Sequence, residues 1–300
     1  MKRVLVIHYS QTGQLTEVLR SLCAPLREAG CTIDHLPIEP VTPYAFPWTR
    51  MRFFGVFPEA VNGDPVDLKP WARPSEHYDL VILGYTIWYL NPSIPIHSFL
   101  KHPAAAAIIK DKPVLTVIGA RNMWVNAQQK VRGLVADLGG RVVGNVLAED
   151  RSPNMVSLVT IIRWMFWGKK DPFFVFPAAG IRQNDIASMA RFGPIIAKHL
   201  MGGNIDDVNA ALLENGSARI KPSLLVLEKR ALVLFGKYRK YILAKVAKDP
   251  ASRERRVGVF SVVLPIGAFI LSPITALATM LLSIFKKQAL DREISELLRY

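Results

Sequence analysis

The sequence predicts an α/β fold in which a five-stranded parallel sheet carries helices on both faces. Near-continuous apolar runs, typical of strands that are buried on both faces, occupy residues 78–88 and 112–120. Stretches with apolar residues at helical spacing lie at 93–109 and 124–138 and alternate with these runs. Strands that alternate with helices form parallel sheets through right-handed crossovers, so few other topologies remain.

The remaining elements of this half follow in a regular order. A strand is expected at 4–7, a helix from about residue 14, and a half-covered or edge strand at 31–38. Residues 39–75 are rich in proline and aromatic residues without a clear period, which indicates a long excursion over the surface. The fifth strand is expected at 139–149.

The segment HYSQTGQLT, at residues 8–16, directly follows the first strand. A strand, a tight turn and a helix N-terminus direct backbone N–H groups and the positive end of a helix dipole at one point. The sequence therefore predicts a phosphate site here, although an ordinary helix cap would use the same residue types. The segment has no GKS/T ending and no G-x-G-x-x-G motif, which argues against a nucleoside triphosphate loop and a dinucleotide fingerprint.

Three segments, YSQTGQLT, GYTIWYLNPSIPIHSFL and VIGARNMW, stand where loops should meet at the carboxyl edge of the sheet. In order and spacing they resemble the phosphate loop and the two ring-contacting loops of flavodoxin-like FMN proteins, over about residues 1–150. The resemblance implies a flavodoxin-like doubly wound sheet with FMN as cofactor. It implies these cofactor-binding residues: Ser10, Gln11, Thr12, Gly13, Gln14, Leu15 and Thr16 for the phosphate, and Thr86, Ile87, Trp88, Tyr89, Ala120, Arg121, Asn122 and Met123 beside the ring.

The whole chain resembles the dialkylresorcinol-condensing enzymes, which share an RVLVI-YSQTGQL opening, a similar length and an apolar C-terminal region. The resemblance implies a pathway in which a ketosynthase partner joins two acyl chains into a dialkylcyclohexanedione. Condensation needs an activated cysteine, and neither Cys23 nor Cys31 stands in a nucleophile setting. Because a flavin is equipped for dehydrogenation, we expect an FMN-dependent oxidoreductase, an aromatase that converts an apolar long-chain cyclic dione to a 2,5-dialkylresorcinol.

Two other classes of function fit the same features. One is a membrane-tethered, flavodoxin-like NAD(P)H:quinone reductase or electron-transfer protein. The other is a membrane-bound scaffold that has kept the fold and lost the flavin. Flavodoxin-like enzymes are often homodimers, and the sequence identifies no interface for one.

Aromatisation needs a hydride acceptor and a base for the acidic ring proton. The residues expected to reach the carboxyl edge of the sheet are Asp150, Tyr85 and Tyr89 as bases, with Arg121 to stabilise an enolate oxygen. His8 lies within the first strand, where we expect a packed core histidine.

The composition changes near residue 220. The formal net charge is +14, and residues 219–256 hold twelve basic and three acidic residues. We divide the chain into a flavodoxin-like domain at 1–205, whose aromatic-rich insertion and last helix lie at 155–200, and a helical region at 206–300. Basic segments bind nucleic acid or anionic lipid, and only lipid explains the neighbouring apolar run, so we expect membrane lipid and no nucleic acid as a partner.

The region 206–300 has two membrane-like patterns. Residues 223–249 show the apolar spacing of a helix that lies in a membrane interface. Residues 257–285 contain no charged side chain, and Pro265 and Pro273 are expected to break them into short pieces of a re-entrant hairpin. A single tilted crossing and a buried helix pair are the alternatives. The apolar run that follows the opening MKR has only four residues, too few for the apolar core of a signal peptide. We therefore expect the protein on the cytoplasmic side of the inner membrane.

The aromatic stretch at 155–176 is expected to form a lid or the wall of a lipid-sized pocket, or else a helix of the core. In the first case an apolar tunnel would run from the flavin ring towards the membrane. Its walls would include Trp164, Phe166, Trp167 and Phe173.

Overall fold

The protein is described by a computed structural model that covers residues 1–72, 75, 77–244, 246–247, 249–285 and 287–300, apart from the side chains at 271–272, 275–276 and 279–285. In these residues, five parallel strands form the central sheet in the order β2-β1-β3-β5-β6. They are β1 (Arg3–His8), β2 (Thr32–Pro37), β3 (Leu80–Trp88), β5 (Pro113–Ala120) and β6 (Arg141–Glu149). This is the flavodoxin-like doubly wound order, and it confirms the expected five-stranded parallel sheet. A short strand, β4 (Asn91–Pro92), pairs antiparallel with the end of β3 and was not expected.

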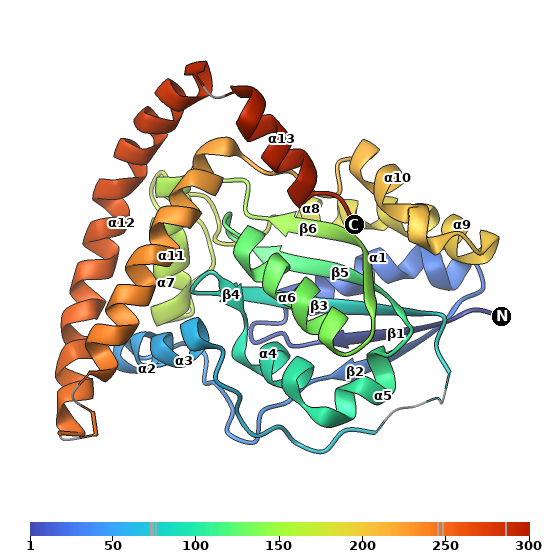
Figure 1. The fold of residues 1–300 in the computed structure, drawn as a ribbon, viewed down its shortest axis with the longest axis horizontal. Coiled ribbons are helices and arrows are strands. Elements are labelled where there is room, and N and C mark those ends of the chain that lie inside the picture. The colour runs from blue at the N-terminus through green and yellow to red at the C-terminus, as the bar shows by residue number, and fades with distance from the viewer. Residues whose placement is uncertain (73–74, 76, 245, 248, 286) are drawn as a thin grey trace.

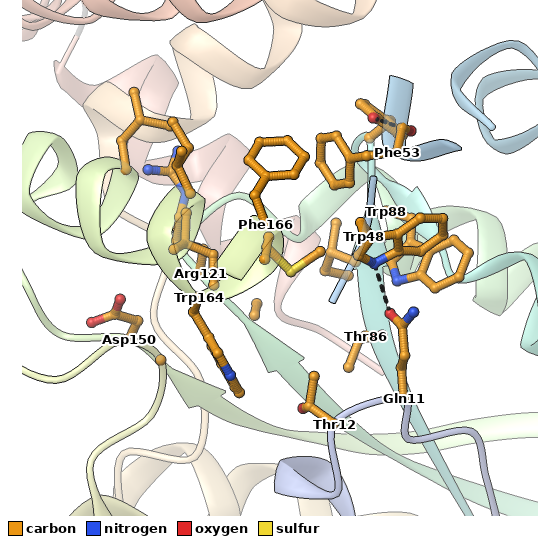
Figure 2. Close-up of a pocket in the computed structure, with 18 of the residues that line it drawn as sticks. Gln11, Thr12, Trp48, Phe53, Thr86, Trp88, Arg121, Asp150, Trp164 and Phe166 are labelled. Atoms are coloured by element: carbon orange, nitrogen blue, oxygen red, sulfur yellow. Dashed lines mark hydrogen bonds between the residues drawn. The ribbon is translucent and has the colours of Figure 1, made fainter. Parts of the chain in front are cut away.

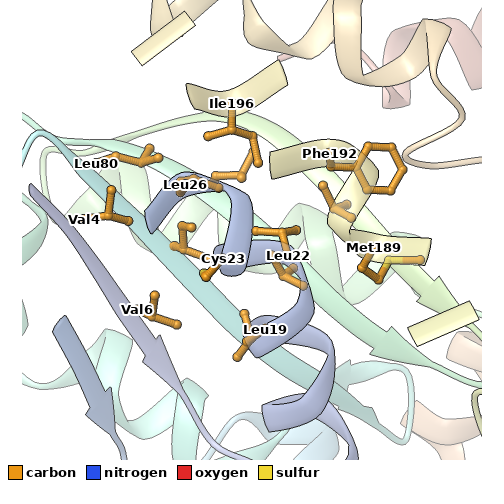
Figure 3. Packing of buried hydrophobic residues seen from close by; sticks show 14 of the residues in the cluster. Val4, Val6, Leu19, Leu22, Cys23, Leu26, Leu80, Met189, Phe192 and Ile196 are labelled. Atoms are coloured by element: carbon orange, nitrogen blue, oxygen red, sulfur yellow. The ribbon is translucent and has the colours of Figure 1, made fainter. Parts of the chain in front are cut away.

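Helices cover both faces of the sheet (Figure 1). On one face, α1 (Gln14–Glu28) packs between the sheet and α9 (Phe192–Gly202), and α1 buries its apolar stripe there because those residues recur every three or four positions. Figure 3 shows Leu19, Leu22 and Cys23 of α1 in this core, with Val4 and Val6 of β1 and with Phe192 and Ile196 of α9. On the other face lie α4 (Ile94–Lys101) and α6 (Val125–Asp137).

Further helices complete the two faces and extend beyond them. They are α2 (Arg50–Gly55), α3 (Phe57–Asn62), α5 (Ala106–Ile109), α7 (Asn154–Trp167), α8 (Gln183–Ala187), α10 (Val208–Glu214), α11 (Pro222–Leu243), α12 (Ala251–Phe285) and α13 (Lys287–Leu297). Short 3₁₀ turns occur at Pro103–Ala105, Ser188–Arg191 and Ile205–Asp207.

The excursion at 39–75 forms α2 and α3 over part of its length. Thr49 begins α2, where its hydroxyl accepts a hydrogen bond from the Arg52 N–H at 3.3 Å. Phe54 and Phe57 then pack against Phe235 and Phe260 in a third apolar cluster, which is separate from the two on the faces of the sheet. These contacts bring α11 and α12 against the excursion, at one side of the sheet.

The C-terminal helices remain attached to the sheet domain. Helices α11 and α12 lie side by side, and α13 returns towards the sheet, where the chain ends (Figure 1). At that end the hydroxyl of Tyr300 accepts a hydrogen bond from Gln128 Nε2 of α6 at 3.0 Å. Apolar packing also continues across the expected boundary at residue 205, because Val208 and Leu212 belong to the same core as β1.

Helix α12 corrects one sequence prediction. It continues through Pro265 and Pro273, so the expected break into short pieces of a hairpin is wrong. An interior proline removes one backbone hydrogen bond and costs about 3 kcal/mol. Packing of Val257 and Phe260 of α12 into the third cluster offsets part of this cost. In the described part of the chain, no helix has the length and apolar character needed to cross a membrane.

Candidate functional site

A cavity of about 880 Å³ lies at the carboxyl ends of β3 and β5, next to the N-terminus of α1. The three expected loops contribute one side of it, through residues 11–12, 14–15, 86–90 and 119–123. Figure 2 shows Thr12 and Gln11 at one end of this cavity and Phe53 and Phe166 at the other. The strand ends therefore meet where the topology predicts a ligand site.

The loop after β1 has the features of a phosphate site. Gly13 adopts a left-handed φ of 80°, which lets the chain turn directly into α1. No side chain of the described residues caps this helix, so the N–H groups of its first turn face the loop. The buried hydroxyl of Ser10 also lacks a hydrogen-bond partner in the described chain. An open helix N-terminus beside an unsatisfied hydroxyl suits a phosphate, and these observations favour the anion site over an ordinary cap.

Two glutamines of this loop use their side chains to hold the cavity walls instead. Gln14 forms a pair of hydrogen bonds with the backbone of Ile181, at 3.0 and 3.1 Å. Gln11 donates to the carbonyls of Tyr44 and Ala45 and accepts a hydrogen bond from Trp48 Nε1 at 3.2 Å. Thr16 lies with its hydroxyl 3.4 Å from His8 Nε2. The side chains of these three residues therefore have partners within the protein.

The two loops at 86–89 and 120–123 line the cavity. All eight of their expected residues are wall residues: Thr86, Ile87, Trp88, Tyr89, Ala120, Arg121, Asn122 and Met123. Tyr89 and Leu90 have left-handed φ values of 50° and 65°, so the chain reverses sharply after β3. Asn126 of α6 stabilises this reversal by donating to the Leu90 carbonyl at 2.7 Å.

Arg121 and Asp150 supply opposite charges to the cavity wall. Burial lowers the pKa of Arg121 to about 10, and the nearby Asp150 carboxylate opposes that shift, so the guanidinium remains charged at neutral pH. The Asp150 carboxylate accepts hydrogen bonds from the Ser152 N–H at 2.9 Å and the Ser157 hydroxyl at 2.6 Å. Arg121 donates a hydrogen bond to the Asn154 carbonyl at 3.1 Å, and both Arg121 and Asp150 line the cavity.

The two tyrosines expected as bases do not share this arrangement. Tyr85 is fully buried on the opposite side of the sheet, donates to Gln128 and does not line the cavity, so its expected role is wrong. Side chains alternate along a strand, which turns Tyr85 away from Thr86 and the cavity. Tyr89 lines the cavity, but its hydroxyl donates to the Phe53 carbonyl at 2.7 Å and burial raises its pKa well above the usual value.

The residues expected to serve packing do so. His8 is buried in β1, and burial lowers its pKa to about 4, so the ring is neutral at neutral pH. Cys23 and Cys31 are free and buried, and burial raises the pKa of Cys23 to about 12. Neither thiol has the low pKa that a nucleophilic cysteine needs.

Sequence reasoning missed the wall that faces the three loops. Trp48 and Phe53, from the excursion, line the cavity with Phe235 of α11 and Leu264 of α12. Trp48 also contacts Trp88 across the cavity edge, with ring centroids 5.5 Å apart. The sequence signal for this wall is the high aromatic content of YAFPWTRMRFF at 44–54, which shows neither the helical nor the strand period of apolar residues.

The aromatic stretch at 155–176 forms α7 and the loop after it. Trp164, Phe166 and Trp167 line the cavity. Phe173 instead lines a neighbouring pocket of about 490 Å³, which shares Trp167 with the cavity. Three of the four residues named for the tunnel thus line the cavity, and the fourth lines the neighbouring pocket.

Glu228 was not a candidate, yet it links the C-terminal region to a cavity loop. Its buried carboxylate, on α11, accepts hydrogen bonds from the N–H groups of Val125 and Asn126 at 3.3 and 2.8 Å. These residues begin α6, directly after the loop at 120–123. Burial raises the pKa of Glu228 from 4.5 to about 7.

This shift predicts that the protein loses stability as the pH rises from about 4.5 to about 7. Over that range the folded state holds a proton on Glu228 that the unfolded state releases, so the free energy of unfolding falls with pH. The full loss is on the order of 3 kcal/mol. Denaturant unfolding at several pH values should show this slope, and Glu228→Gln should flatten it. An unchanged slope in the variant would assign the pH dependence to other groups.

Comparisons with known proteins give structural likenesses alone. No protein-family model matches the chain, and no curated protein matches it. A putative flavoprotein from Bacteroides eggerthii is 22% identical, covers 49% of this chain and 88% of its own, and has a TM-score of 0.39. A flavoprotein in complex with FMN from Lactobacillus acidophilus is 16% identical over 49% and 93% of the two chains, with a TM-score of 0.38. Oxidised flavodoxin 1 from Bacillus cereus is 14% identical over 66% and 99%, with a TM-score of 0.36. Likenesses this low say nothing of activity, and the fold class rests on the strand order of the sheet.

Proposed function

We propose that the chain is an FMN-dependent oxidoreductase. The observation that carries this proposal is one cavity that joins the uncapped N-terminus of α1 to the ends of β3 and β5. The first-turn N–H groups of α1, with the hydroxyls of Ser10 and Thr12, would hold the FMN phosphate. The loops at 86–89 and 120–123 would flank the flavin ring.

Bound FMN would supply a two-electron acceptor that takes a hydride from an organic substrate. The chain's own residues would complete the reaction around it. Arg121 offers a cation to a substrate oxygen that gains negative charge, and the attraction between the two charges is stronger in these buried surroundings than in water. Asp150 offers a carboxylate to accept the proton that leaves the substrate carbon, and Ser152 and Ser157 orient it.

Within this class we propose the aromatisation of a dialkylcyclohexane-1,3-dione to a 2,5-dialkylresorcinol. The ring loses one hydride and one proton, two hydrogens in all, and its two carbonyls become phenolic hydroxyls. Apolar walls beyond the three loops, from α2, α7, α11 and α12, support a substrate that carries alkyl chains. A ketosynthase that makes such a dione is the partner that this proposal implies.

The same walls support a second candidate, a flavodoxin-like quinone reductase that takes electrons from NAD(P)H. A quinone with a lipid tail has the same combination of a polar ring and an apolar chain. The two functions differ in the direction of electron flow between substrate and flavin.

Anaerobic titration separates them. The purified protein should absorb light as a flavoprotein, and a dialkylcyclohexane-1,3-dione should bleach that absorbance while resorcinol forms in equal amount. A quinone reductase would keep its colour with the dione, lose it with NAD(P)H, and regain it with quinone. A folded protein that holds no flavin even after incubation with FMN would exclude both functions.

A further inference from the structure

Helix α12 has two apolar sides with different surroundings. One side lines the cavity through Leu264, Pro265 and Ala268. The other side is exposed along a stripe whose six described side chains are 47–62% accessible: Val259, Val262, Ile266, Ile270, Ile274 and Leu277. These positions recur every three or four residues, so they form one continuous face. Within the described chain, no other segment covers this face.

A second exposed apolar group lies on the opposite border of the cavity. Trp167, at the end of α7, is 64% exposed and lines both the cavity and the neighbouring pocket. Phe174 and Val175, in the loop that follows, are 99% and 90% exposed. Exposed apolar side chains therefore flank the cavity on both its α7 side and its α12 side, which is typical of an interaction surface.

The start of α12 and the chain that returns after α13 are held by the same body. Near its start, Arg253 binds the Glu59 carboxylate at 2.7 and 2.9 Å and the Gly55 carbonyl at 2.9 Å. Beyond its end, the Leu298 carbonyl accepts a hydrogen bond from Asn209 at 2.9 Å. A membrane-spanning helix must deliver its ends to opposite sides of a hydrocarbon core about 30 Å thick. Figure 1 shows α12 along the outer edge of the molecule, so a helix attached in this way can instead lie flat on a surface.

The basic residues near the exposed stripe of α12 indicate which kind of surface it contacts. Arg255 lies one turn before Val259 on the same face of α12, and the adjacent helix α11 exposes Lys237 and Lys240. The segment 219–256, which includes all of these, holds twelve basic and three acidic residues. A partner with an apolar interior and an anionic surface satisfies both the stripe and these cations.

We propose that the outer stripe of α12 docks in the plane of an anionic phospholipid bilayer, with the 167–175 loop beside it. The cavity between them then opens at the lipid surface. Where the proposed function holds, an alkylated cyclic substrate enters the cavity from the bilayer without crossing water. Docking itself requires neither flavin nor substrate, so it can be tested separately.

The test is co-sedimentation with vesicles made of phosphatidylglycerol and phosphatidylcholine. The full chain should bind them and should bind vesicles of phosphatidylcholine alone more weakly. Ile266→Glu combined with Ile270→Glu should weaken binding at least tenfold, because both charges fall within the stripe. The matched control is Met201→Glu, which changes another exposed apolar residue, on α9 across the sheet domain, and should bind as the unmodified chain does.

Two results would overturn the docking proposal. One is a full chain that fails to bind anionic vesicles while it retains its native melting temperature. The other is a dimer in solution that the stripe variants dissociate while vesicle binding stays unchanged, since the stripe would then bind a second copy of the chain. Flavin reduction by a dione remains measurable in either case, so failure of docking and failure of the proposed function are distinguishable.

Discussion

Replacing Thr12 with glutamate should release FMN from the protein. Thr12 lies in the loop before α1, on the cavity wall and next to the left-handed Gly13. The glutamate carboxylate would stand beside a phosphate that carries close to two negative charges, and one pair of like charges at 4 Å costs about 4 kcal/mol near a protein surface. Solvent screening reduces this cost, so we expect FMN to bind at least about 100-fold more weakly.

Fluorescence titration of the apoprotein with FMN measures this effect. Thr12→Gln is the matched control, because it has nearly the same shape as glutamate without the charge, and it should lose far less affinity. Riboflavin lacks the phosphate, so its weaker binding should respond equally to the two variants. If the folded Thr12→Glu protein binds FMN as tightly as the unmodified chain, the phosphate lies elsewhere.

The sequence predicts the sheet and the three loops because these depend on local patterns. Double-sided burial gives β3 and β5 continuous apolar runs, and the turn at Gly13 needs a residue that tolerates a positive φ. Strand ends in a doubly wound sheet then meet at one edge, whatever the helices outside do. The wall residues at 86–89 and 120–123 follow from that rule.

Other parts of the site depend on contacts between segments far apart in the chain. Glu228 reads as a surface residue of a basic helix, and only the packing of α11 on α6 buries it at a helix N-terminus. Trp48 reaches the cavity because the excursion folds back over Trp88. The position of Tyr85, by contrast, depends on a local rule, because the alternation of side chains along β3 places it on the face of the sheet that α4 and α6 cover.

The prolines of α12 show where a local rule fails. Pro265 and Pro273 are strong local signals to end a helix, and α12 nevertheless continues past both. Its start packs against α2 and α11, and Arg50 of α2 donates a hydrogen bond to Ser261 of α12 at 2.9 Å. These contacts at the start of α12 offset part of the cost of the hydrogen bonds that the prolines remove. The apolar content of 257–285 predicted a membrane contact, but it could not predict which side of the helix would line a cavity.

Placing a charge at Phe166 should reduce the turnover of long-chain diones far more than that of a short-chain analogue. Phe166 lies on α7 at the end of the cavity away from Thr12, where it contacts Phe53 and Phe54 at ring distances of 5.4 and 6.3 Å (Figure 2). Each buried methylene of an alkyl chain contributes about 0.8 kcal/mol to binding. A carboxylate in this wall keeps water with it, so chains that reach the wall lose that contribution. Four methylenes in contact would amount to about 3 kcal/mol, or roughly a 100-fold loss in kcat/KM.

The measurement compares kcat/KM for a long-chain and a short-chain dione in Phe166→Asp, with flavin content as the check on folding. Phe166→Leu is the control, because it keeps the wall apolar and should reduce both substrates only slightly. The Asp variant should retain its flavin, since the phosphate loop lies at the other end of the cavity. A short-chain dione that does not reach α7 should react within about threefold of its usual rate, because it never contacts the altered wall. Equal losses for both substrates would show that Phe166 supports the fold of α7 and that the alkyl chains bind elsewhere.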